Sequence, residues 1–252
     1  MKKLLLAVLF ISNIGFVYSQ TLDKKYLPVV TDFITSIKNG KIEKLSNNIR
    51  YPLNRAYPIP PIKNKQEFVK RYKEVFDDEL TKKIINSNTL TDWDFMGWRG
   101  IMLLNGELWL NDSDGKLLSV NHRSKFETLE QSRLIALEKT GLHPSIKKFD
   151  KPILIFQTAQ YRVRIDDLGN RNYRYASWPL KSKMSDKPSI VLSGGQYDPD
   201  GSGGSGNFNF KSGIYLYTCF ISARGDNNAL GYLIIKKDSK KILSQEVKKI
   251  IP

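Results

Sequence analysis

Apolar side chains recur every three or four positions in the first third of the chain, and this spacing predicts amphipathic helices. The first helix is expected over residues 22–39 and ends before Gly40, a residue typical of a helix C-terminus. A short helix follows over 42–49, and a longer one begins after the capping residue Asn64 and continues to about residue 85. Three prolines within 57–61 exclude a helix there and predict an extended segment.

After residue 88 the apolar spacing shortens to the two-residue period of β-strands. Four short strands are predicted over 92–121, and Asn105-Gly106 is a strong hairpin turn because both residues tolerate positive φ. A helix over about 127–139 separates these strands from the rest. From residue 151 onward the pattern predicts eight short strands and no helix.

This order of elements predicts an α+β chain with two domains. Helices pack on an antiparallel meander in residues 20–123, a helical connector occupies 124–150, and an all-β sandwich or small barrel occupies 151–252. Because domain joins lie in exposed linkers, we expect the chain to be cut by proteases between about residues 139 and 151.

The N-terminal order of elements resembles the nuclear transport factor 2-like, or cystatin-like, cone fold. The stretches YPLNR at 51–55, EFVKRY at 67–72 and GWRGI at 97–101 with NGELW at 105–109 resemble a recurrent module of exported bacterial proteins. The resemblance covers residues 22–122 and implies the cone architecture. Cone folds serve both as enzymes and as binders, and their enzymes usually carry a His/Asp or Tyr/Asp pair inside the cone. Here only His122 lies near the meander, so the resemblance assigns no catalytic residue.

Residues 1–19 have the pattern of a secretory signal peptide. Two lysines precede an apolar run from Leu4 to about Val17, and Val17 and Ser19 occupy the positions before a cleavage site at Gln20. The run is shorter than the ~20 residues that cross a bilayer. We therefore expect an exported protein of the periplasm or the medium, without stable membrane insertion once the signal is removed.

Composition excludes several chemistries. Two histidines and one cysteine cannot form a His/Cys zinc site, and no phosphate-binding or dinucleotide motif is present, so we expect no metal, no cofactor and no catalytic residue. Cys219 lies in an apolar stretch that reads as a buried strand. The net charge of +15 favours an acidic partner. Nucleic acid is disfavoured as that partner, because the protein is expected to be exported. The dibasic pairs at 147–148, 236–237, 240–241 and 248–249 are interpreted as solubilising strand edges.

Residues 161–175 interleave aromatic and basic side chains. With a two-residue period, Arg162 and Arg164 share one face of a strand, and Arg174 joins them across the turn. One interpretation is a solvated charged face. The other is a cationic surface that binds carboxylates or phosphates, because the planar arginine fork pairs with them in a bidentate manner.

Two further segments are candidate binding sites. Trp98 and Arg99 either belong to an aromatic-lined pocket or, for the tryptophan, to the core together with Trp93. The glycine-rich residues 196–206 are interpreted chiefly as a long mobile hairpin loop. In the alternative, Gly201, Gly203 and Gly204 present backbone N–H groups to an anion, or the preceding aspartates begin a calcium loop that lacks its final glutamate.

Together these features predict a secreted or periplasmic, non-enzymatic binding protein, one form of which is an inhibitor of, or immunity protein against, an envelope-active enzyme or toxin. The alternative is a cone-fold enzyme, a hydrolase or isomerase acting in an aromatic-lined concavity. The predicted binding residues are Arg162, Arg164, Arg174, Trp98, Arg99, Gly201, Gly203 and Gly204.

The cleavage pattern gives a first testable prediction. The exported chain should begin at Gln20, because Val17 and Ser19 are acceptable to signal peptidase at the third and first positions before the cut. Intact-mass measurement of the protein recovered outside the cytoplasm checks this. A mass that retains Met1 would contradict it.

Overall fold

The computed structural model describes residues 22–201, 204–222 and 229–251. The predicted signal peptide lies outside these residues. The chain divides into two compact units, one containing the described residues up to Arg50 together with Leu80–Asn121, the other containing Tyr51–Glu79 and the residues from His122 onward. Both combine helices with antiparallel strands, so the mixed class is confirmed. Residues 51–79, which the sequence pattern assigned to the N-terminal domain, group with the C-terminal residues.

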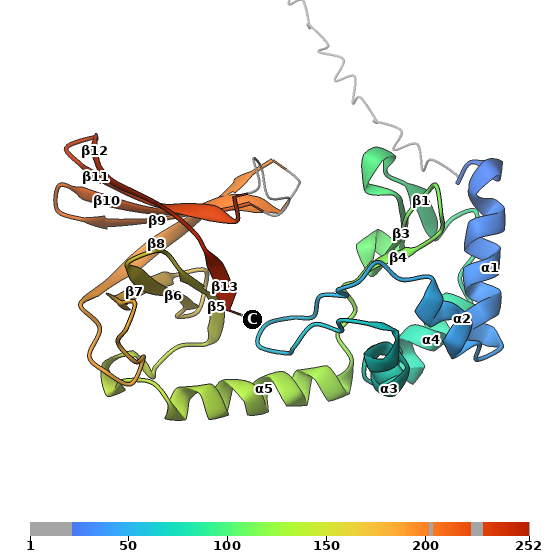
Figure 1. Ribbon diagram of the computed structural model, residues 1–252. Helices are drawn as coiled ribbons and strands as arrows, with labels where there is room; N and C mark the ends of the chain where they lie inside the picture. The colour runs from blue at the N-terminus through green and yellow to red at the C-terminus, as the bar shows by residue number, and fades with distance from the viewer. Residues whose placement is uncertain (1–21, 202–203, 223–228, 252) are drawn as a thin grey trace, which may run out of the picture. The chain divides into compact units, whose positions relative to one another are not determined.

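The first unit packs two helices beside a small sheet of strand order β1-β2-β3-β4 (Figure 1). Its helices are α1 (Leu27–Lys38), which follows a 3-10 turn at Lys24–Tyr26, and α2 (Ile42–Asn47); its strands are β1 (Trp93–Phe95), β2 (Ile101–Leu103), β3 (Leu108–Leu110) and β4 (Leu117–Val120). Phe33 of α1 meets Trp93 edge to face at 6.3 Å, and the fully buried Trp93 donates its indole N–H to Ser87 Oγ at 2.9 Å. The apolar stripe read from the sequence therefore faces this sheet.

The helix predicted from Asn64 to about residue 85 is two helices, which corrects that expectation. Asn64 does cap α3 (Lys65–Val75) by accepting the backbone N–H of Glu67 at 3.0 Å. The helix then stops at Phe76, and α4 (Asp78–Ile85) starts afresh. Phe76 is fully buried and stacks on Tyr72 at 5.1 Å. Packing of this ring, which a linear apolar stripe does not report, accompanies the break.

The second unit is dominated by a curled antiparallel sheet of order β12-β11-β10-β9-β8-β7-β6-β5-β13. The strands are β5 (Lys151–Gln157), β6 (Tyr161–Asp167), β7 (Tyr173–Pro179), β8 (Ile190–Asp200), β9 (Ser205–Ser212), β10 (Tyr215–Ile221), β11 (Gly231–Lys237), β12 (Lys240–Glu246) and β13 (Lys249–Ile251). Helix α5 (Lys125–Thr140) and a 3-10 turn, η4 (Pro144–Ile146), precede them. Among the residues described, no helix is both long and apolar enough to cross a bilayer.

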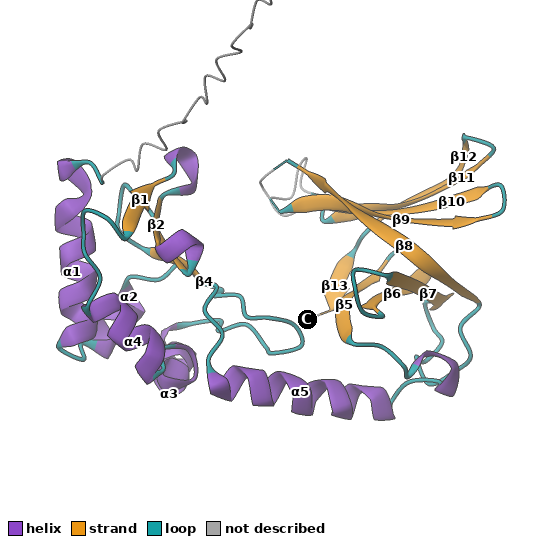
Figure 2. Cartoon of the chain, turned by 180° about the vertical axis from the view of Figure 1, so that it is seen from behind, coloured by secondary structure: helices purple, strands orange, loops and turns teal. Residues whose placement is uncertain are grey.

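The last segment of the chain links the two edges of the sheet. The two edge strands, β12 and β13, are successive parts of the chain and are separated only by Val247 and Lys248. Val247 donates its backbone N–H to Gly231 of β11 at 2.9 Å, and Lys248 donates to Gln157 of β5 at 2.8 Å. One segment thus joins both edges of the sheet, with β13 lying beside β5 in Figures 1 and 2. The two edges of the curled sheet are therefore linked by one continuous segment, and the name barrel is used from here on for the curled sheet of β5–β13.

Alternate side chains of these strands fill the interior. The buried members of this core are Phe156, Val163, Ile165, Tyr175, Phe208, Phe210, Cys219, Leu233 and Val247. Cys219 points inward as predicted, and burial raises the pKa of its thiol, so the group stays neutral and enclosed.

Two glycines allow aromatic rings to lie across neighbouring strands, and they show that the glycine-rich segment is mostly strand. A Cβ on Gly195 would lie 2.1 Å from the ring of Phe210, and one on Gly206 would lie 2.5 Å from the hydroxyl of Tyr197. The segment predicted as a mobile loop over 196–206 is therefore largely ordered by pairing between β8 and β9, and the described residues Gly201 and Gly204 lie at the tip.

Replacement of Gly195 by alanine should lower the free energy of unfolding by about 1–3 kcal/mol, because the new methyl group would overlap a fully buried ring. Gly141→Ala is the matched control, since the nearest atom to its Cβ lies 3.7 Å away. Thermal unfolding of both variants measures the difference. Equal melting temperatures would contradict the close contact.

Candidate functional site

Arg164 and Arg174, two of the three arginines predicted to form a binding surface, are buried and share one carboxylate. Arg164 Nε donates to Asp166 Oδ1 at 2.7 Å, and Arg174 Nη2 donates to Asp166 Oδ2 at 2.6 Å. All three side chains lie on the outer face of β6 and β7, as the two-residue period predicted. The expectation that this face is accessible is nevertheless wrong for these two arginines, because Arg164 and Asp166 are 0% exposed and Arg174 is 4% exposed.

The chain segment after α5 covers this face. Leu142, Ile146 and Phe149 pack against Ala176 and Trp178 as a second apolar core outside the barrel. Leu142, Ile146 and Phe149 therefore belong to the core of the second unit and anchor the segment between α5 and β5 to the sheet. The proteolytic cut expected between about 139 and 151 is disfavoured, since cleavage needs an exposed linker with few contacts.

Backbone carbonyls and an aromatic ring complete the surroundings of the buried arginines. Arg174 donates to the carbonyl oxygens of Ile146 at 2.6 Å and Lys148 at 2.9 Å. The ring of Phe149 lies 4.8 Å from the Arg164 guanidinium. Burial by itself lowers the pKa of Arg164, but the adjacent carboxylates of Asp166 and Glu138 raise it above its ordinary value. The cluster is thus a paired, structural set of charges.

Helix α5 reaches the cluster through a polar face. Its residue Glu138 accepts from Arg164 Nη1 and from the hydroxyl of Tyr57 at 3.2 Å. About two and three turns earlier, Gln131 donates to the carbonyl of Tyr57 at 2.6 Å and Glu127 pairs with Arg55 at 2.6 Å. Spacings of four and seven residues place these side chains on one side of the helix. The proline-containing segment, whose strands meet at Leu53 and Ile62, therefore lies along α5.

The remaining predicted site residues are distributed over three places. Arg162 is half-buried and donates from Nη1 to the carbonyl of Ser182. Trp98 is 65% exposed, so its predicted core packing is wrong, whereas that of Trp93 is confirmed. The Arg99 guanidinium lies over the ring of Trp109 at 5.5 Å.

The predicted anion-binding glycines belong to the β8–β9 tip. Gly201 and Gly204 have positive φ values of 66° and 85°, whereas Gly203 lies outside the described residues. Within the described ranges, no group of three or more His, Cys, Asp or Glu side chains is placed to hold a metal ion.

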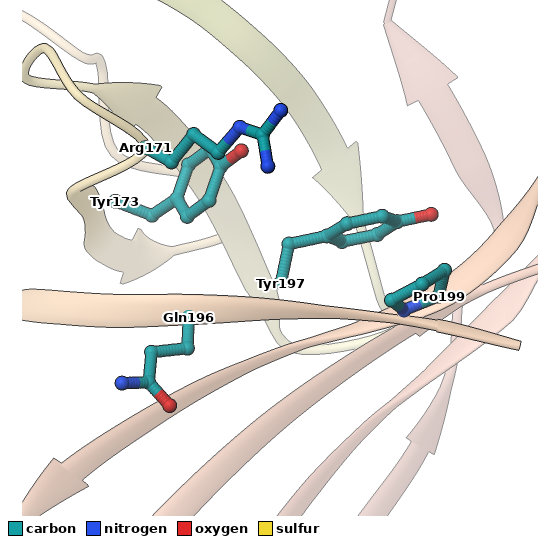
Figure 3. A pocket seen from close by; sticks show the side chains of 5 residues that line it. All are labelled: Arg171, Tyr173, Gln196, Tyr197 and Pro199. Atoms are coloured by element: carbon teal, nitrogen blue, oxygen red, sulfur yellow. The ribbon is translucent and has the colours of Figure 1, made fainter. Parts of the chain in front are cut away.

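An open recess of about 540 Å³ lies beside this tip, at one end of the barrel. Its lining residues are Arg171, Tyr173, Gln196, Tyr197 and Pro199. Arg171 comes from the β6–β7 turn and is exposed, and no ion pair is found for it among the described residues. In Figure 3 the arginine and both tyrosines face the same open space, while the amide of Gln196 extends to the other side of β8. The volume is within the range of pockets that bind small ligands or side chains.

The floor of the recess is continuous with the barrel core. The ring of Phe208 lies 5.1 Å from that of Tyr173 and 4.7 Å from that of Tyr197. Tyr197 is also held by a hydrogen bond from its hydroxyl to the carbonyl of Ser205 at 3.3 Å. Burial, followed by the charge of Asp167, raises the pKa of Tyr173, so this phenol stays protonated and can donate a hydrogen bond. The two tyrosine rings of the recess are therefore held in place by the core. The guanidinium of Arg171 is the one positively charged group among the residues that line it.

The sequence did not predict this recess, although two of its lining residues lie in the segment 161–175 that was singled out for binding. Arg171 and Tyr173 are within the aromatic-basic stretch 161–175, but the strand period drew attention to the arginines on the strand instead of the turn. Tyr197 lies more than twenty residues further on, within the segment interpreted as loop. No local signal joins the two, because they are brought together by the pairing of β7 with β8, which sets Tyr173 opposite Gly195, two residues before Tyr197.

A second polar pair lies at the start of α5. His122 Nε2 is 3.1 Å from Asp77 Oδ1, and the carbonyl of His122 accepts from Arg55. A hollow of about 270 Å³ lies next to Asp77 and is also lined by Asp78, Glu79, Lys125 and Phe126. The His122 ring is only 8% exposed and is not part of that lining. The pair therefore has the placement of a structural contact.

Comparison with protein-family models, with curated proteins and with solved structures finds no match for this chain.

The shared carboxylate predicts a large stability effect. Asp166→Asn keeps the side-chain shape but removes the charge that two buried arginines share, so we expect a loss of about 3–5 kcal/mol in the free energy of unfolding. Glu246→Gln, which breaks an exposed pair with Lys248, should change stability little. Chemical denaturation of both variants gives the comparison, and equal stabilities would contradict the structural role.

Proposed function

We propose that this chain is an exported, non-enzymatic binding protein that takes an acidic segment of a partner protein into the recess at the mouth of its barrel. The single observation that supports this is the recess itself: an exposed arginine beside two tyrosine rings supported by a buried phenylalanine. Inhibition of, or immunity to, an envelope-active enzyme or toxin is the specific form that we favour, because such proteins act by contact alone.

The side chains of the recess suit this role chemically. Arg171 offers two parallel N–H donors to a carboxylate. Tyr173 and Tyr197 supply large contact areas with little rotamer freedom, which is why tyrosine and arginine dominate the binding energy of protein interfaces. The overall charge of +15 speeds the approach of an acidic partner.

Location and architecture form part of the same proposal. The signal-like residues 1–19 support export to the periplasm or the medium. The helices and four-stranded sheet of the first unit support a cystatin-like arrangement for the N-terminal half. An enzyme of the cone fold has less support, since Trp93 is core and Trp98 is solvent-exposed, so neither indole frames a concavity.

Matched baits test the proposal. The chain beginning at Gln20, its Arg171→Ala/Tyr197→Ala variant and its Trp98→Ala variant are each used to capture partners from an envelope extract. We expect a partner that the parent and Trp98→Ala retain, that raised salt weakens, and whose affinity falls by tens-fold with the double variant, since interface tyrosines and arginines typically contribute about 2 kcal/mol or more.

Thermal unfolding of each bait verifies that the recess variants keep the fold, which the exposed position of Arg171 favours. A partner that the double variant binds normally, and that Trp98→Ala loses, would place the binding surface in the first unit and overturn the assignment. The former candidates Arg164 and Arg174 are unsuitable for this test, because replacing them would disturb the core.

A further inference from the structure

The opposite end of the barrel has a different chemistry. In an antiparallel meander, alternate connections fall at opposite ends, so the β9–β10 and β11–β12 hairpins lie together, away from the recess (Figure 1). The backbone N–H of Asp238 in one hairpin donates to the carbonyl of Ile214 in the other at 3.0 Å. We call the residues of these two hairpins, 211–216 and 236–242, the lysine tip.

Like charges face one another across the strands of the lysine tip. Lys236 lies directly opposite Lys241, and Lys237 lies opposite Lys240, while Lys211 lies on β9, which is separated from β11 by β10. All five are exposed, and no ion pair is found for any of them among the described residues. Asp238 is the one acidic side chain in these two segments. Like-charged pairs directly opposite in a sheet are destabilising, so folding alone does not explain them.

Protection of a strand edge explains only half of this arrangement. Lysines on an edge strand discourage pairing with other chains, and β12 is such a strand. Strand β11, by contrast, pairs with β10 on one side and with β12 on the other. Lys236 and Lys237 therefore have no edge to protect, which corrects the interpretation of this pair from the sequence.

Two aliphatic side chains of the lysine tip are exposed to solvent. Ile214 at the β9–β10 turn is 53% exposed, and Ile242 is 54% exposed. Ile242 has no cross-strand partner because a β-bulge leaves it between Lys241, opposite Lys236, and Leu243, opposite Ile235. Bulges redirect a side chain, and here the redirected side chain is apolar and outward. A hollow of about 360 Å³ bordered by Lys211, Ile214, Tyr215 and Lys236 separates the two hairpins.

We propose that the lysine tip docks this protein on the surface of a bilayer that contains anionic lipids. The ammonium groups contact lipid phosphates, and the two isoleucines enter the boundary between headgroups and acyl chains, as apolar side chains of interfacial proteins do. Tyr215, whose ring lies 5.9 Å from Lys237 Nζ, occupies the position of an interfacial aromatic residue.

The lysine tip combines positive charge with exposed aliphatic side chains, and this combination favours an anionic membrane over other polyanionic partners. A nucleic acid or an acidic protein would match the lysines, but neither accounts for two outward isoleucines on a bulge and a turn. Because this surface and the recess lie at opposite ends of the barrel, membrane docking leaves the recess free, and the two proposals stand independently.

Vesicle flotation tests the proposal with the purified chain beginning at Gln20. Vesicles of phosphatidylcholine mixed with phosphatidylglycerol should bind the chain, and vesicles of phosphatidylcholine alone should bind it weakly. Replacing Lys236, Lys237, Lys240 and Lys241 by glutamine should weaken binding by about 600-fold, since each lysine near an anionic surface contributes roughly fivefold. Ile214→Ser/Ile242→Ser should weaken it by about tenfold.

The matched control replaces four exposed lysines of other elements, Lys38, Lys41, Lys63 and Lys70, by glutamine, which changes the net charge equally. It should retain most of the binding. Three outcomes would overturn the proposal: equal binding to both vesicle types, equal loss in the control and tip variants, or binding of the chain to a soluble polyanion such as heparin without binding to either vesicle. Circular dichroism confirms that each variant is folded.

Discussion

The second unit depends on one carboxylate, Asp166, that two buried arginines share. Removing ions from water is costly, and this arrangement offsets the cost by pairing the charges on adjacent strands and by directing further guanidinium donors to backbone carbonyls. Because those carbonyls belong to residues 146 and 148, the same interactions fasten the segment after α5 over the sheet. The ion pair between Glu138 and Arg164 also attaches helix α5 to the sheet. The outer face of β6 and β7 is thereby used for structure and withdrawn from binding.

The two surfaces that we propose for binding lie at the ends of the barrel. The closing segment joins both edges of the sheet, so the hairpin ends are where side chains of different strands converge with access to solvent. One end converges on aromatic rings and an arginine, and the other on lysines and isoleucines. Gly195 and Gly206 contribute at the first end, since the absence of a Cβ lets Phe210 and Tyr197 lie flat across a neighbouring strand.

Helix α5 shows how a helix can pack against the rest of the second unit through polar side chains. Its inward side presents Glu127 and Gln131, both buried, while Leu129 and Leu137 face solvent. Glu127 meets an arginine and Gln131 meets a backbone carbonyl, so both of these buried side chains are hydrogen-bonded. The spacing of apolar residues does not indicate which side of such a helix is buried. Its start is marked by Ser124, whose hydroxyl caps the helix by accepting the N–H of Glu127 at 3.1 Å.

Interactions between residues close together in the sequence determine most helices and strands. They also determine which side chains of a strand share a face, so the sequence by itself was sufficient to predict both. Asn64 caps a helix, Asn105 and Gly106 adopt positive φ, Cys219 points inward, and Arg164 and Arg174 share the outer face, all as their neighbours along the chain dictate. A two-residue period, however, assigns a side chain to a face without saying what covers that face. Tertiary structure alone decided that Phe149 and its neighbours bury those arginines, and that the pairing of β7 with β8 joins a turn arginine to tyrosines of separate strands, because both results depend on contacts between segments that no local pattern connects.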